Sequence, residues 1–108
     1  MIYEWRVYKV APGKLPLLNE RFRKYWAEIF ERNGIKLIGF WEAIIGRSST
    51  LYYMVAYESL AHRDECWKSM RSDPEAAKVR KKLEEEQGTI TEYVENMLLM
   101  PTDYSPLK

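Results

Sequence analysis

The chain has 108 residues, of which 46% are hydrophobic and 14% aromatic, and its 17 Lys and Arg against 16 Asp and Glu give a formal net charge of +1. This length supports one domain with one core, residues 1–108. The balanced charge argues against nucleic acid, membrane and polyanionic partners. One cysteine, Cys66, excludes an internal disulfide framework. Because the amino terminus carries no signal-peptide pattern, we expect a cytoplasmic protein.

The first half of the chain contains three predicted strands and one helix. Alternating side chains over residues 2–10 predict a strand. Apolar residues recur at helical spacing from Leu15 to Ile29, and Asn33-Gly34 is a typical helix end. Two further strands are expected at 36–45 and 51–57, joined by a polar turn.

The second half contains two predicted helices and a last strand. Ser59 is placed to cap a helix that begins at Leu60. Asp73-Pro74 predicts a second cap, with the following helix ending at Gly88. A strand is expected over 91–100, and the proline-containing tail after it cannot extend a central strand.

The two central strands are apolar on both faces. In 36–45, alternation places Leu37, Trp41, Ala43 and Ile45 on one side and Ile38, Phe40 and Ile44 on the other. In 51–57, it places Leu51, Tyr53, Val55 and Tyr57 opposite Tyr52, Met54 and Ala56. Such strands have to be covered on both faces, and the helices cover only one. A second copy of the chain is therefore the expected cover.

The order strand, helix, strand, strand, helical segment, strand is that of an α+β, ferredoxin-like βαββαβ fold, with a four-stranded antiparallel sheet and helices on one face. Two copies packed by their open sheet faces would enclose a dimeric α+β barrel. We expect Ile2, Glu4, Arg6 and Tyr8 on that open face.

Five segments, in order, resemble the NIPSNAP family. They are Tyr3-Glu4-Trp5-Arg6 with Pro12-Gly13-Lys14, Gly39-Phe40-Trp41-Glu42 with Gly46, Tyr57-Glu58-Ser59-Leu60-Ala61-His62-Arg63, Ser72-Asp73-Pro74-Glu75, and the stretch from Asn96 to Leu107. The resemblance implies a dimeric α+β barrel, as in small oxygenase and heme-degrading relatives, and implies little about a reaction.

Glu4 and Arg6 share one face of the first strand, and if that face lines a cavity both charges are partly desolvated. One interpretation is an internal ion pair that fixes the dimer register. The other is that Arg6 anchors a carboxylate or enolate through its planar fork.

His62, the only histidine, is the remaining weak candidate for a base, although capping at the surface is its simpler role. Cys66 lies on an apolar helix stripe and is expected to be a buried small hydrophobe. The spacing of these residues matches no metal site, and no cofactor motif is present.

Trp41 and Tyr57 are the expected aromatic neighbours of the Glu4–Arg6 pair. An apolar, aromatic cavity with few charges suits a small hydrophobic ligand. The sequence therefore predicts a homodimer that binds a small apolar or aromatic molecule in the barrel cavity. The alternative is a cofactor-independent oxygenase or isomerase, in which Arg6 orients the substrate and Glu4 or His62 takes a proton. The sequence leaves open whether the protein is an enzyme.

Overall fold

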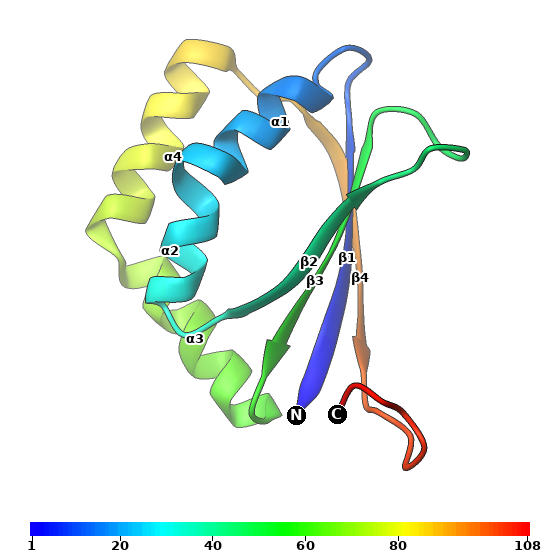
Figure 1. Ribbon diagram of the computed structural model, residues 1–108. Coiled ribbons are helices and arrows are strands. Elements are labelled where there is room, and N and C mark those ends of the chain that lie inside the picture. Colours follow the sequence, from blue (N-terminus) through cyan, green and yellow to red (C-terminus); the bar gives the residue numbers. More distant parts are fainter.

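A computed structural model describes residues 1–108 (Figure 1). Its elements, in chain order, are β1 (Ile2–Val10), α1 (Leu15–Arg21), the π-helical turn η1 (Phe22–Trp26), α2 (Ala27–Arg32), β2 (Lys36–Glu42), β3 (Thr50–Tyr57), α3 (Leu60–Ser72), α4 (Pro74–Gln87) and β4 (Thr91–Leu99). The predicted order of elements is confirmed. No helix is long and apolar enough to cross a bilayer.

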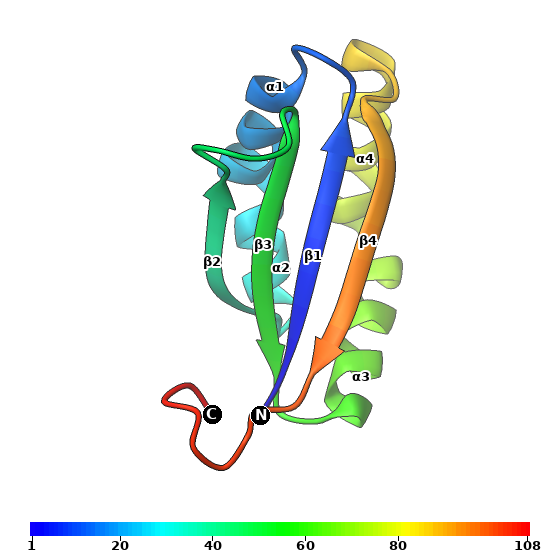
Figure 2. The ribbon, with the colours of Figure 1, turned by 90° about the vertical axis from the view of Figure 1, so that its right-hand side faces the viewer.

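The four strands form one antiparallel sheet in the order β2-β3-β1-β4, and all helices lie on one face of it (Figures 1 and 2). This is the predicted α+β, ferredoxin-like arrangement. The sheet of one chain is open, with β2 and β4 at its edges, and does not close into a barrel.

The predicted helix caps are confirmed. The Ser59 side chain accepts a hydrogen bond from the His62 amide, and the Asp73 carboxylate accepts bonds from the amides of Glu75 and Ala76. Asp73 therefore separates α3 from α4, and Pro74 opens α4 without losing a helical hydrogen bond.

The first helix differs from the prediction by containing a wider turn. The Ala27 amide bonds to the carbonyl of Phe22, five residues earlier. This places the buried Phe22 ring against the rings of Tyr8, Phe40 and Tyr53, at centroid distances of 6.1, 5.2 and 5.2 Å. Single π turns of this kind are frequent near functional sites.

The expected face of β1 was wrong. Glu4 and Arg6 point toward the helices, because Glu4 bonds to Arg63 of α3 and Arg6 lies over the Trp67 ring of α3. Trp5 of β1 is on the open face, where its ring stacks on Tyr52. Alternation predicts which residues share a face but cannot say which face the helices cover.

The expected faces and length of β2 also need correction. A bulge at Ile38 shifts the register between Leu37 and Gly39. As a result Leu37 packs on the core with Phe40, while Trp41 is on the opposite, open face beside Trp5. The strand ends at Glu42, so Ile44 and Ile45 belong to no strand and are fully exposed in the β2–β3 loop.

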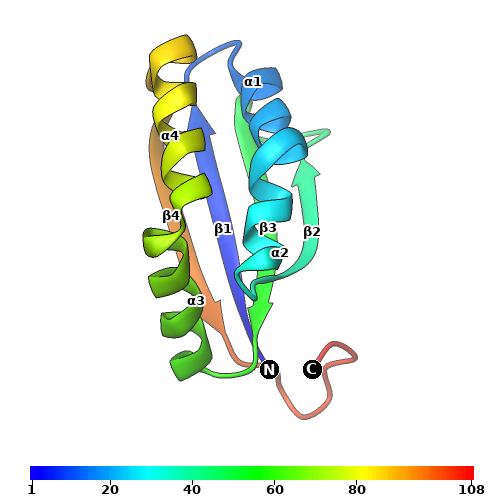
Figure 3. The ribbon, with the colours of Figure 1, turned by 90° about the vertical axis from the view of Figure 1, so that its left-hand side faces the viewer.

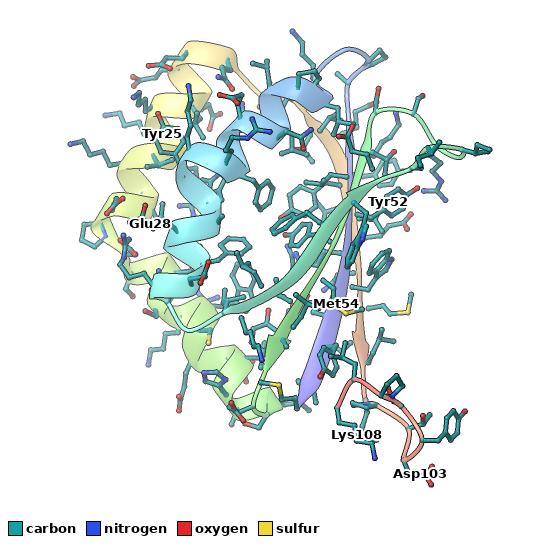
Figure 4. The ribbon with its side chains drawn as sticks, viewed as in Figure 1. Tyr25, Glu28, Tyr52, Met54, Asp103 and Lys108 are labelled. Carbon is teal, nitrogen blue, oxygen red and sulfur yellow. The ribbon has the colours of Figure 1, made fainter.

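The open face of the sheet is rich in large apolar side chains. Those at its surface include Trp5, Trp41, Tyr52, Met54, Met97 and Leu99. Figure 4 shows Tyr52 and Met54 pointing away from the helices. The core itself lies on the other face, between the sheet and the helices.

Candidate functional site

The Glu4 carboxylate is the centre of a buried polar cluster and accepts five hydrogen bonds. Oε1 accepts from the Tyr57 hydroxyl at 2.7 Å and from Nε of Arg63 at 3.1 Å. Oε2 accepts from Arg6 at 2.9 Å, from Arg63 at 3.1 Å and from the Asn96 amide at 2.8 Å. The side chain has no solvent exposure. The acceptor capacity of this carboxylate is filled by the protein.

These contacts determine the protonation state of Glu4. Burial would raise the pKa of Glu4, but the hydrogen bonds from Arg63, Asn96 and Tyr57 and the charge of Arg6 lower the pKa to about 2. The carboxylate is thus ionised at neutral pH, and no lone pair is free to take a proton from a ligand. The geometry argues against Glu4 as a general base.

Arg6 is in contact with three aromatic side chains. Its Nε donates to the Tyr53 hydroxyl at 2.7 Å and one terminal nitrogen donates to the Tyr8 hydroxyl at 3.0 Å. Its guanidinium carbon lies 5.1 Å from the centroid of the Trp67 ring. Burial lowers the pKa of Arg6. The neighbouring Tyr53, Tyr8 and Glu4 raise this pKa by more than burial lowers it, so the guanidinium stays charged.

Two adjoining cavities lie on the helix side of the sheet and share Trp67 as a wall. One, of about 320 Å³, is lined by Arg6, Arg63, Asp64, Trp67 and Arg71. The other, of about 220 Å³, is mainly aromatic and apolar, with Tyr8, Phe22, Trp26, Phe30, Trp67 and Met70 in its lining, and it also borders Arg21 and Arg80. In Figure 3, β1 runs between the α1–α2 helix and the α3–α4 pair, which supply these walls.

The structure brings together three of the predicted site residues. Tyr57 joins Glu4 and Arg6, since its hydroxyl donates to Glu4 and accepts from Nε1 of Trp67 at 2.9 Å. Burial, the hydrogen bond to Glu4 and its charge raise the pKa of Tyr57. Trp41 is not part of this cluster, because it lies on the open face and borders a separate cavity at the β2 edge.

His62 lines neither of the two adjoining cavities. Its Nδ1 accepts the Glu58 amide at 3.0 Å, and its Nε2 lies 3.4 Å from Sγ of Cys66. Cys66 is buried, as predicted, and burial together with Glu65 raises the pKa of its thiol. A thiol with a raised pKa is a poor nucleophile, so this contact is best explained as packing against Gly34, where an added Cβ would lie 3.3 Å from Sγ of Cys66 and 3.5 Å from Nε2 of His62.

Sequence reasoning missed four residues of the site, which are Arg63, Trp67 and Asn96 of the cluster and Arg71 of the adjoining cavity. A signal for Arg63, Trp67 and Arg71 was present, because they recur every four residues and so share one face of α3. Asn96 had no such signal, since it is 92 positions from Glu4 and meets it only through the β1–β4 register.

Comparison with known proteins identifies relatives of the chain. The NIPSNAP family model matches residues 3–106. Protein NipSnap homolog 3A of Pongo abelii and that of Homo sapiens are each 32% identical over 76 residues, which is 69% of this chain and 30% of theirs. The chain thus spans less than a third of the length of these curated relatives.

Solved structures with the same fold carry the same family name. A NIPSNAP family protein from Agrobacterium tumefaciens superimposes with a TM-score of 0.87 at 30% identity, covering 99% of this chain and 98% of its own. A second one from that organism, described as of unknown function, has a TM-score of 0.86 at 28% identity over 100% and 94% of the two chains. The family model, the curated relatives and these structures agree, and the chain belongs to the NIPSNAP family.

Proposed function

We propose that the protein is a homodimeric binding module, in which each subunit holds a small apolar or aromatic molecule in the cavities between its sheet and its helices. The aromatic cavity that adjoins the fixed Arg6 guanidinium is the observation that carries this proposal. The position differs from the inter-sheet space expected from the sequence, because the charged cluster lies on the helix side.

The dimer is supported by the composition of the open sheet face. Its centre carries apolar and aromatic side chains, among them Trp5 and Met97. One end carries polar residues, where Arg47 lies 3.9 Å from Glu95 and Lys9 lies 4.0 Å from Glu92. An apolar centre with polar groups at its margin is typical of interfaces between subunits, and a large exposed apolar patch is uncommon on monomers.

Replacing Met97 by lysine tests the dimer. Met97 is 54% exposed in the single chain, so a lysine there should leave the subunit folded and separate the two copies. Leu60→Lys is the matched control, because Leu60 is 59% exposed but lies on the helix layer. Light scattering after size exclusion should give a dimer for the wild type and Leu60→Lys and a monomer for Met97→Lys. A monomeric wild type at tens of micromolar would refute the dimer.

Binding rather than catalysis is favoured because neither of the bases predicted from the sequence, Glu4 and His62, is available to a ligand in the cavities. The lone pairs of Glu4 are occupied by five donors, and Nε2 of His62 is turned to Cys66. An oxygenase or isomerase that abstracts a proton needs a group within hydrogen-bond reach of its substrate. Oxygen uptake measured with any compound that binds would test this alternative directly.

The four tryptophans offer a test of where a ligand binds. Trp26 and Trp67 line the aromatic cavity, whereas Trp5 and Trp41 lie on the open face. Indole, 1-naphthol and a naphthoquinone can be titrated while the four indole N–H resonances are followed by NMR, with assignment by single Trp→Phe variants. We expect shifts of the Trp26 and Trp67 signals. Shifts confined to Trp5 and Trp41 would place the ligand between the sheets, and the absence of any shift would refute the binding proposal.

A further inference from the structure

We infer that the molecule bound in these cavities is a small monoanion, with a carboxylate held among Arg6, Arg63 and Arg71 and an apolar or aromatic body lying along Trp67 toward Phe30 and Met70. This inference rests on the proposed function and names the chemical class of its ligand.

The charges around the larger cavity do not balance. It is lined by three arginines, Arg6, Arg63 and Arg71, and by one acidic residue, Asp64. Glu4 behind them supplies one further negative charge and is paired with both Arg6 and Arg63. One positive charge is therefore left over, which a single carboxylate would neutralise.

The arginines also have hydrogen-bond donors to spare. A guanidinium carries five N–H groups. Arg6 donates three hydrogen bonds, to Tyr53, Glu4 and Tyr8, and Arg63 donates two, to Glu4. Arg71 forms no ion pair with a protein carboxylate, in contrast to the other two. A planar fork of such donors matches a carboxylate in a bidentate contact.

The helix α3 places these donors beside an apolar surface. Arg63, Trp67 and Arg71 follow one another at intervals of four residues and so line one side of the helix. Trp67 is held in place by its bond to Tyr57, and its ring borders both cavities. A ligand with its charge at the arginines would pass along this ring and reach Phe30 and Met70 in the second cavity.

A carboxylic acid and its amide test whether the ligand needs a negative charge to bind. 1-Naphthylacetate and 1-naphthylacetamide have the same aromatic body and differ in the anionic group. With the Trp26 and Trp67 resonances as the readout, we expect the acid to bind the full chain at least tenfold more tightly than the amide. Phenyl phosphate, a dianion near neutral pH, should bind more weakly than phenylacetate, because the larger cavity, where the anionic group is placed, has only one uncompensated positive charge.

Arg71→Gln tests the residue that carries no structural ion pair. Lys68→Gln is its control, because it removes the same charge from the same exposed helix without touching either cavity. We expect Arg71→Gln to lower the affinity for the acid at least fivefold and leave that for the amide unchanged, while Lys68→Gln changes neither by more than twofold.

The outcomes distinguish this inference from the function on which it rests. If acid and amide shift the Trp26 and Trp67 signals with equal affinity, the binding module stands and the monoanion is wrong. Tighter binding of phenyl phosphate than of phenylacetate, or equal effects of Arg71→Gln and Lys68→Gln, would also overturn the monoanion. If neither naphthyl probe nor any neutral aromatic compound shifts these signals, both the inference and the proposed function fail.

Discussion

Removing the charge of Glu4 should be among the most destabilising single changes to this protein, and its effect should depend on pH. A glutamine at this position keeps one oxygen as an acceptor. Its N–H₂ group takes the place of the other oxygen and faces side chains that are themselves hydrogen-bond donors. At the least costly orientation it loses the two bonds that Oε1 accepts, from Tyr57 and Arg63. Hydrogen bonds to charged groups contribute about 1.5–3 kcal/mol each, so we expect Glu4→Gln to lower the free energy of unfolding by about 3–5 kcal/mol at pH 7.

The pH dependence of the free energy of unfolding gives an independent value for the contribution of the Glu4 carboxylate to stability. The pKa of Glu4 falls from an ordinary value of 4.5 to about 2 in the folded protein. This depression is equivalent to about 3 kcal/mol of stability, fully present above pH 4.5 and lost as the pH falls from 4.5 toward 2. About 1.4 kcal/mol of it should be gone at pH 3.5. Glutamine does not titrate, so the difference between wild type and variant should shrink by that amount.

Urea unfolding followed by tryptophan fluorescence at pH 7.0 and pH 3.5, at one protein concentration, measures both quantities. Taking the difference between wild type and Glu4→Gln cancels the titration of the other acidic residues. Arg6→Met is a milder variant for comparison. It leaves Glu4 with four of its five hydrogen bonds and should destabilise the protein less than Glu4→Gln does. A difference below about 1 kcal/mol at pH 7, or one equally large at pH 3.5, would refute the role assigned to this carboxylate.

Two further predictions concern the turns and the tail. Gly34 has a φ of +88°, and an added Cβ would lie 3.3 Å from Sγ of Cys66. Gly34→Ala should therefore lower stability by more than the roughly 1–2 kcal/mol expected from the backbone alone. Gly13→Ala is its control in the same unfolding assay, because Gly13 has a φ of +81° with open space around it. If the two variants lose equal amounts of stability, the contact between the added Cβ and Cys66 has no effect. In the tail, the exposed Tyr104 and Leu107 predict an arm across the neighbouring subunit of the proposed dimer. Truncation from Thr102 onward should then lower the melting temperature by several degrees, and an unchanged melting curve would argue against that arm.

The sequence by itself determined the local structure and the family. Alternation in 2–10 and helical spacing after Leu15 gave the element types, since these periods are properties of neighbouring residues. Ser59 and Asp73 marked two helix starts, because a side-chain acceptor there satisfies amides of the first turn. The order of these elements was sufficient to predict the ferredoxin-like sheet, and the five motifs were sufficient to predict the family.

Tertiary structure decided where the candidate site lies. A period of two divides β1 into two sets of residues but is symmetric between them, so only packing against α3 assigned Glu4 and Arg6 to the helix side. The bulge at Ile38 likewise reversed the predicted relation between Leu37 and Trp41, because one extra residue exchanges the faces beyond it. The partners of Glu4 come from positions 57, 63 and 96, which only the folded chain brings to one carboxylate.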